Sequence, residues 1–210
     1  DKITGKPPMT VSFKASNSFD RNELPLSYLW TFDTLGTSTA IDTNVVFIEP
    51  GSYQIYVDVK NTDGLISSDS LQVHVLPNGT PYKGKPVQVP GTIEAEHYDV
   101  GGEGIAYRDV DANNQFYRSG EGVALSGDGG QVHVNWIVAG EWIEYTFEVK
   151  EEGTYKVTPD VATVPGCGKV RRCRDNVDIR GKKQVTGTGS FINWKTIQID
   201  PVALSPGRHI

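Results

Sequence analysis

Short segments rich in β-branched and aromatic residues recur about every ten residues along this chain and are separated by Gly, Pro, Asn and Asp. This spacing is typical of strands joined by tight turns, and no apolar repeat of helical period persists. The predicted strands are 11–14, 26–32, 44–47, 52–59 and 70–75 in the first half, and 91–98, 132–138, 142–149, 154–162, 177–179 and 194–199 in the second. The pattern therefore predicts an all-β protein.

A Pro- and Gly-rich stretch, LPNGTPYKGKP, interrupts the strand pattern after residue 75 and offers almost no apolar side chain to a core. Such a stretch is typical of a domain boundary. With 210 residues the chain is long enough for two domains, each with a core of its own. We predict a first domain at 1–77, a linker at 78–88 and a second domain at 89–210.

The charge of the chain argues against a polyphosphate partner. Its formal net charge is −6, and the Lys and Arg residues look scattered rather than gathered in a stripe, so we predict no binding to nucleic acid. No stretch approaches membrane-spanning length, so we predict no membrane insertion. The chain begins Asp-Lys-Ile without an apolar leader, which reads as a mature or excised segment.

The first domain carries the runs ASNSFD, LSYLWTF and EPGSYQIYVDVKNTDGL, and over residues 1–77 it resembles the polycystic-kidney-disease (PKD) type of domain. The resemblance implies an immunoglobulin-like β-sandwich used as a spacer in secreted bacterial polysaccharide and protein degraders. Tyr28, Trp30 and Phe32 alternate, so they share one strand face that a sandwich must bury. Trp30 or Tyr53 could instead serve as a ligand platform, but core packing is the favoured interpretation.

The second domain contains GTIEAEHYDVGGEGIAYRDVDANN, YRSGEGVAL, VNWIVAGEWIEYTFEVKEEGTYKV, TGSFINWKTIQ and LSPGRH. In this order they resemble a family 6 carbohydrate-binding module of the type attached to agarase-like enzymes. The resemblance implies a jelly-roll, galactose-binding-like β-sandwich whose end loops hold a pyranose ring between two aromatic rings. The apolar C–H face of a sugar stacks on such rings, while its hydroxyls need polar partners. The implied carbohydrate-binding residues are Trp136, Phe191, Tyr107 and Glu121.

Two groups of oxygen-bearing side chains suggest calcium. Glu94 and Glu96 flank Ala95 in a predicted strand, so they project from one face and cannot both lie unpaired in a core. The family resemblance implies a structural calcium site there; the alternative is a solvent-exposed pair. Asp109, Asp111 and Asn113 form an Asp-x-Asp-x-Asn loop that could hold a second calcium, although it lacks the Gly and distal Glu of an EF-hand.

Cys167 and Cys173 are the two cysteines of the chain and lie close together in sequence. We predict a local disulfide between them in an oxidising compartment, with two free thiols as the alternative.

The two resemblances together imply that the chain binds polysaccharide without catalysis. They also imply that it is covalently linked to a glycoside hydrolase in a secreted bacterial protein. The family extends past residue 210, so we expect the last strand of the module to be missing. A purely structural or adhesive spacer is the main alternative. An independent glycoside hydrolase is less favoured, because Glu141, Glu144 and Glu148 lie in no recognisable catalytic motif.

Overall fold

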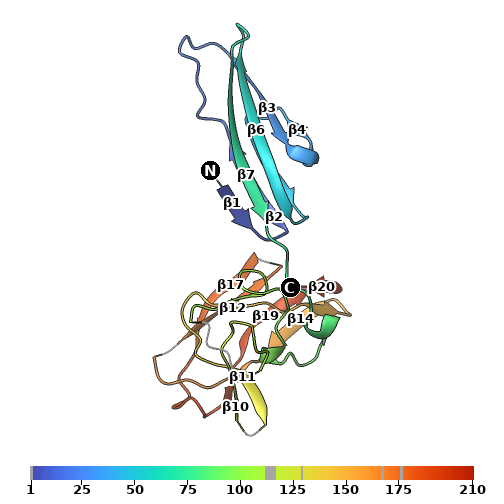
Figure 1. The fold of residues 1–210 in the computed structure, drawn as a ribbon, viewed down its shortest axis with the longest axis vertical. Helices are drawn as coiled ribbons and strands as arrows, with labels where there is room; N and C mark the ends of the chain where they lie inside the picture. Colours follow the sequence, from blue (N-terminus) through green and yellow to red (C-terminus); the bar gives the residue numbers. More distant parts are fainter. Residues whose placement is uncertain (1, 112–116, 129, 167, 176) are drawn as a thin grey trace. The chain divides into compact units, whose positions relative to one another are not determined.

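The computed structural model describes residues 2–111, 117–128, 130–166, 168–175 and 177–210. Regular structure in these ranges consists of strands and three short 3-10 turns, η1 (Asp33–Leu35), η2 (Tyr82–Gly84) and η3 (Ala95–His97). The predicted all-β class is therefore confirmed. Residue contacts divide the chain into two compact units, Asp1–Pro77 and Asn78–Ile210 (Figure 1). None of the described helical turns has the length or apolarity to cross a membrane.

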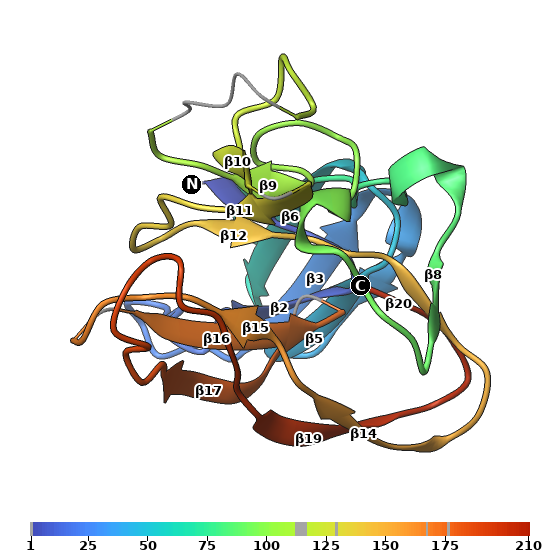
Figure 2. The same ribbon diagram turned by 90° about the horizontal axis from the view of Figure 1, so that it is seen from below.

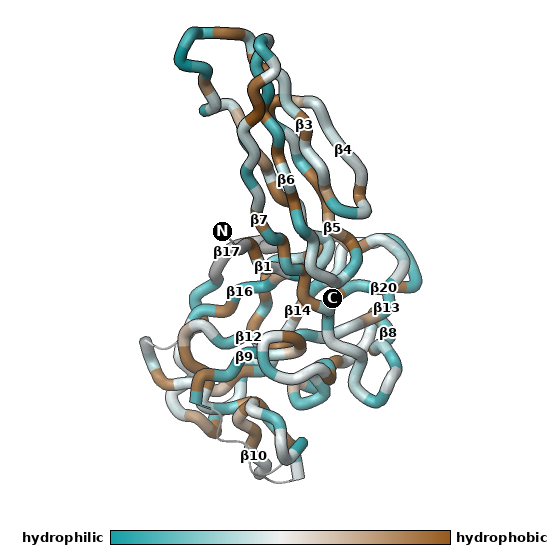
Figure 3. The backbone as a smooth tube through the Cα atoms, turned by 45° about the horizontal axis from the view of Figure 1, so that its top comes forward, coloured by the Kyte–Doolittle hydropathy of each residue, from teal (hydrophilic) through white to brown (hydrophobic). Residues whose placement is uncertain are grey.

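The first unit is a sandwich of a five-stranded sheet and a strand pair (Figure 1). The five-stranded sheet has the order β1 (Lys2–Gly5), β7 (Ile66–Val75), β6 (Gly51–Asn61), β3 (Leu26–Phe32) and β4 (Thr37–Ser38). The pair is β2 (Met9–Lys14) with β5 (Asp42–Phe47). Hydrophobic and hydrophilic segments alternate along these strands (Figure 3), as expected where one strand face is buried and the other solvated.

Aromatic rings fill the space between the two layers of the first unit. The ring of Phe13 on β2 lies 5.7 Å from that of Trp30 and 5.3 Å from that of Phe32, both on β3. The buried polar atoms are satisfied: the indole N–H of Trp30 donates to the Ala40 carbonyl at 3.0 Å, and the Tyr53 hydroxyl donates to the Glu49 carbonyl at 2.8 Å. Trp30 and Tyr53 are thus core residues, as the favoured interpretation predicted.

The second unit consists of short paired strands that form two groups in Figure 2. One group contains β9 (Tyr107–Arg108), β10 (Leu125–Asp128), β11 (Gln131–Val134) and β12 (Trp142–Ile143). The other contains β14 (Gly153–Val157), β15 (Asp160–Val161), β16 (Lys169–Arg174), β17 (Val177–Gln184), β18 (Lys195–Thr196) and β19 (Ile199–Leu204). A further sheet pairs β13 (Phe147–Val149) with β8 (Val87–Val89) and β20 (Gly207–His209).

The predicted linker at 78–88 is wrong, because this segment packs into the second unit. The Gly79 N–H donates to Oε1 of buried Glu144 at 2.7 Å, and Thr80 forms a β-bridge with Val100. β8 then pairs in parallel with β13. The stretch has few apolar side chains, but its backbone donors and acceptors are satisfied by the second unit, which holds it in place.

The predicted strands of the second unit differ from the structure at three places. Residues 91–98 form no strand; the chain there makes the turn η3. The predicted strand 154–162 is split into β14 and β15 at Pro159, since proline has no N–H for a ladder. The strand β16, which contains Arg171 and Arg172, was not among the predicted strands.

Candidate functional site

Trp136 projects from the loop that follows β11, and 75% of its surface is exposed. Its φ of +51° is in the left-handed region, which a bulky residue rarely adopts. Hydrogen bonds hold the loop on both sides: the Asn135 N–H donates to the Ala124 carbonyl at 3.0 Å, and the Val138 N–H donates to Oε2 of Glu141 at 2.9 Å. The indole is therefore presented to solvent by a backbone that is fixed around it.

Phe191 lies in a second loop, and 67% of its surface is exposed. This loop is fixed through buried Thr188, whose N–H donates to the Thr163 carbonyl at 2.8 Å and whose hydroxyl accepts from the Thr163 N–H at 2.9 Å. The Asn193 side-chain amide donates to the Thr188 carbonyl at 2.6 Å and closes the loop. Phe191 is thus an exposed ring on an internally bonded loop.

The two loops, 135–141 and 188–194, are called the aromatic loops from here on, and they are joined by a ring contact. His133 on β11 meets Trp194 with 5.2 Å between ring centroids and an interplanar angle of 69°. His133 precedes Trp136 by three residues, and Trp194 follows Phe191 by three. This contact joins the bases of the two loops. The carbohydrate-binding role of Trp136 and Phe191 stays a prediction.

Tyr107, the third predicted carbohydrate-binding residue, is a core residue instead. Only 5% of its surface is exposed, and its ring packs edge-on against Tyr98 with 5.6 Å between centroids. Its hydroxyl accepts from the Gly122 N–H at 2.7 Å. The β9–β12 pairing turns the Tyr107 side chain into the core, so the ring cannot meet a sugar.

Glu121, the fourth predicted carbohydrate-binding residue, is held by Arg118, with 2.8 Å between Oε2 and Nη2. Sequence analysis missed Arg118. Its largely buried guanidinium also donates to the Glu96, Tyr98 and Asp99 carbonyls. Its Cζ lies 3.5 Å from the centre of the Tyr98 ring, a cation–π contact. The one available signal was an Arg three residues before a Glu in the Gly-rich stretch YRSGEGV, and the observed role of this Glu is to anchor the arginine.

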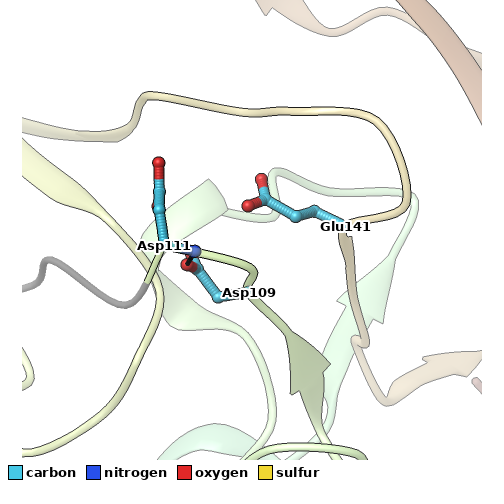
Figure 4. A group of neighbouring side chains, drawn as sticks. All are labelled: Asp109, Asp111 and Glu141. Atoms are coloured by element: carbon cyan, nitrogen blue, oxygen red, sulfur yellow. Dashed lines mark hydrogen bonds between the residues drawn. The ribbon is translucent and has the colours of Figure 1, made fainter.

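Among the described residues, one group of acidic side chains could share a cation, with ligand oxygens within 4.8 Å of one another: Asp109, Asp111 and Glu141 (Figure 4). We call these three residues the acidic group. Two of the predicted second-calcium residues are in this group. Asn113 lies outside the described residues, and Glu141 was not predicted as a ligand. Partial desolvation, followed by the neighbouring Asp109 carboxylate, raises the pKa of Asp111. An oxygen-only group of this kind fits calcium.

The carboxylates of this acidic group also hold the backbone. Oε1 of Glu141 accepts from the Val110 N–H at 3.0 Å, while its Oε2 accepts from Val138 in the first aromatic loop. Oδ2 of Asp109 accepts from the Ala124 N–H at 3.1 Å. Glu141 therefore joins the 109–111 segment to the loop that carries Trp136.

The predicted shared strand face of Glu94 and Glu96 does not exist, because both residues lie at the turn η3. In the described ranges neither belongs to a set of three or more close acidic or other metal-ligating side chains. Calcium binding there stays a prediction. The disulfide also stays a prediction, since Cys173 is exposed on β16 but Cys167 lies outside the described residues.

Comparison with protein-family models finds two matches in this chain. Residues 2–75 match the model of the PKD domain, and residues 115–209 match that of the carbohydrate binding module (family 6). A search of curated proteins found no match.

Two solved structures are among the chains that match. One is described as "Structural basis for the promiscuous specificity of the carbohydrate-binding modules from the beta-sandwich super family"; it is 17% identical, with a TM-score of 0.32, over 99% of this chain and 89% of that chain. The other is the Bacteroides ovatus mixed-linkage glucan utilization locus protein SGBP-B in complex with a mixed-linkage heptasaccharide, 10% identical with a TM-score of 0.30. That match covers 95% of this chain and 56% of the Bacteroides chain. By these family matches, residues 2–75 of this chain belong to a PKD domain, which is followed at residues 115–209 by a family 6 carbohydrate-binding module.

Proposed function

We propose that the second unit binds a polysaccharide, agar-type or another β-glycan, by stacking sugar rings on Trp136 and Phe191. The observation that carries this proposal is the pair of aromatic loops, which present two exposed rings and are joined at their bases by the contact between His133 and Trp194. An exposed aromatic ring on a hydrogen-bonded loop loses little conformational entropy on binding, which favours a ligand with an apolar ring face.

The biological role that we propose is targeting. In a secreted bacterial enzyme, the module would hold a covalently linked glycoside hydrolase at its polysaccharide and raise the local substrate concentration without taking part in the chemistry. The PKD domain would act as the spacer. Calcium at Asp109, Asp111 and Glu141 would stabilise the first aromatic loop, since Glu141 already binds the backbone of that loop.

Hydrolysis by the module itself is disfavoured by what its carboxylates contact. Oε1 of buried Glu144 accepts from Gly79, and both oxygens of Glu141 accept from backbone N–H groups. Carboxylates that hold the backbone in this way are poorly placed to protonate a leaving group or to activate water.

Affinity electrophoresis in gels that contain agarose, laminarin, xylan or cellulose tests the proposal. We expect slowed migration in at least one gel, and loss of that effect in Trp136→Ala and in Phe191→Ala. Phe19→Ala is the matched control, because Phe19 is an exposed aromatic residue of the PKD domain and should not affect migration. Normal migration of the wild-type chain in every gel would leave the spacer as the better interpretation, and release of reducing sugar would favour an enzyme.

A further inference from the structure

One hairpin holds more cations than the scatter expected from the sequence would give to a segment of its length. The hairpin is β16 with β17, which pair antiparallel from Lys169 opposite Gln184 to Arg174 opposite Val177. It holds seven of the 20 Lys and Arg residues but only two of the 26 Asp and Glu residues. A strongly basic hairpin therefore belongs to a chain whose formal net charge is −6.

One face of β16 is occupied by contacts with β19. Nη2 of Arg172 donates to the Asp200 carbonyl at 2.7 Å, and Nη1 of Arg174 donates to the Ala203 carbonyl at 2.5 Å. From β17, Nζ of Lys183 lies 3.6 Å from Oδ1 of Asp200. These contacts fix the hairpin on the second unit.

The other face of β16 is exposed to solvent. Exposure alternates along the strand, so that Lys169, Arg171 and Cys173 are exposed while the residues between them are partly buried. The exposed row thus places an ammonium and a guanidinium group two residues apart on one face. Both groups bind carboxylates and sulfates well, and the planar guanidinium can do so with two parallel hydrogen bonds.

The base of this hairpin continues into the loop that carries Phe191. The Val185 N–H donates to the Gly168 carbonyl at 3.1 Å and extends the pairing past Gln184. Residues 163–165 and 187–189 then lie side by side, since the Thr188 N–H donates to the Thr163 carbonyl and a Cβ on Gly187 would lie only 2.5 Å from the Cα of Pro165. The hairpin that carries Lys169 and Arg171 therefore leads through Val185 into the second aromatic loop.

We propose that the exposed row of Lys169 and Arg171 binds anionic groups, carboxylate or sulfate, of the polysaccharide that the aromatic loops bind. This inference rests on the proposed function and narrows its ligand to an acidic glycan. A glycan with widely spaced charges suits a short basic row in a net-acidic protein, whereas nucleic acid, with a charge about every 1.7 Å of duplex, would be repelled by the rest of the chain.

The test uses the full 210-residue chain in affinity electrophoresis with agarose, laminarin, carrageenan as the sulfated polymer and alginate as the carboxylated one. At about 0.05 M salt we expect carrageenan or alginate to bind at least about fivefold more tightly than the neutral polymers, and the difference to vanish at about 1 M salt. Retention by one of the two anionic polymers identifies the anion, and retention by both shows recognition of charge alone. K169E/R171E should remove the preference and leave the affinity for neutral polymers unchanged.

The control K150E/K156E changes the net charge equally at two exposed lysines of the second unit outside the hairpin and should keep the preference. K169Q/R171Q should lose the preference for anionic polymers without introducing negative charges that repel them. The melting temperature of each variant verifies that it folds. An equal effect of K150E/K156E, or equally tight binding of a short DNA duplex, would overturn the inference. If binding depends on Trp136 but is equally tight for neutral and anionic polymers, the role of Lys169 and Arg171 is refuted while the proposed function stands. If the chain binds no polymer, the proposed function itself is refuted.

Discussion

Removal of the Trp136 indole should weaken polysaccharide binding by a factor that follows from its exposure. A covered Trp buries about 200 Å². Because 75% of Trp136 is exposed and a sugar covers one of its two faces, stacking removes about 75 Å² from water, worth ~2 kcal/mol. Trp136→Ala should therefore raise Kd about 25-fold for the polymer that the wild-type chain binds best, as measured by affinity electrophoresis or titration calorimetry.

The backbone of Trp136 supplies a second variant that separates binding from folding. Because φ is +51°, Trp136→Gly relieves a conformation that costs a non-Gly residue about 1–2 kcal/mol. Trp136→Gly should therefore bind as weakly as Trp136→Ala while having a higher free energy of unfolding. If both variants bind within twofold of the wild type, or if Phe19→Ala in the PKD domain weakens binding as much, the stacking argument is refuted.

Three further predictions concern stability. Gly79→Ala should lower the free energy of unfolding of the second unit by about 2 kcal/mol in urea titrations, because a Cβ there would lie 2.8 Å from the Cβ of Asp99 and 3.1 Å from that of Ala106. An unchanged urea midpoint would contradict this close packing. Folding raises the pKa of Asp111 above 3.8, so the melting temperature should fall as pH rises and this carboxyl ionises. Asp111→Asn should flatten that fall and should reduce any stabilisation by calcium at pH 7. If calcium stabilises the variant as much as the wild type, Asp111 is not a calcium ligand. The hydrogen bond from Asn61 lowers the pKa of Asp20, so the ionised carboxylate stabilises the fold at neutral pH and this stabilisation is lost below about pH 3.8. Asp20→Asn should have a lower melting temperature than the wild type at neutral pH and the same melting temperature in acid. A constant difference in melting temperature between the two proteins down to about pH 2 would refute this linkage.

The first unit could be predicted well because its strands follow the simplest rule of a sandwich. Phe13, Trp30 and Phe32 occupy alternate positions of long strands, and all three are buried. The pairing of β3 with β6 runs without a break from Leu26 opposite Asn61 to Phe32 opposite Ile55. Where strands are long and one face is buried, the residue pattern determines which face that is.

Prediction failed in the second unit where side chains replaced strand neighbours as partners of the backbone. The segment TIEAEHY alternates like a strand, yet the carbonyls of Glu96, Tyr98 and Asp99 accept hydrogen bonds from the guanidinium of Arg118, about twenty residues away. The linker failed for the same reason, since Glu144 accepts from the backbone of Gly79. Local patterns contain no information on such distant donors and acceptors, so these segments needed the structure.

The same kind of contact explains why the position of Trp136 could be predicted while its support could not. The family resemblance identified the ring, but the strained backbone at Trp136 persists only if neighbouring hydrogen bonds offset its cost. Those bonds come from Ala124 before the ring and from Glu141 after it, and Glu141 in turn holds Val110. Because these bonds already fix the loop, the proposed stacking of a sugar on Trp136 would carry little ordering cost. The acidic group is therefore part of what presents the indole, and a change at Glu141 should affect sugar binding without touching the sugar.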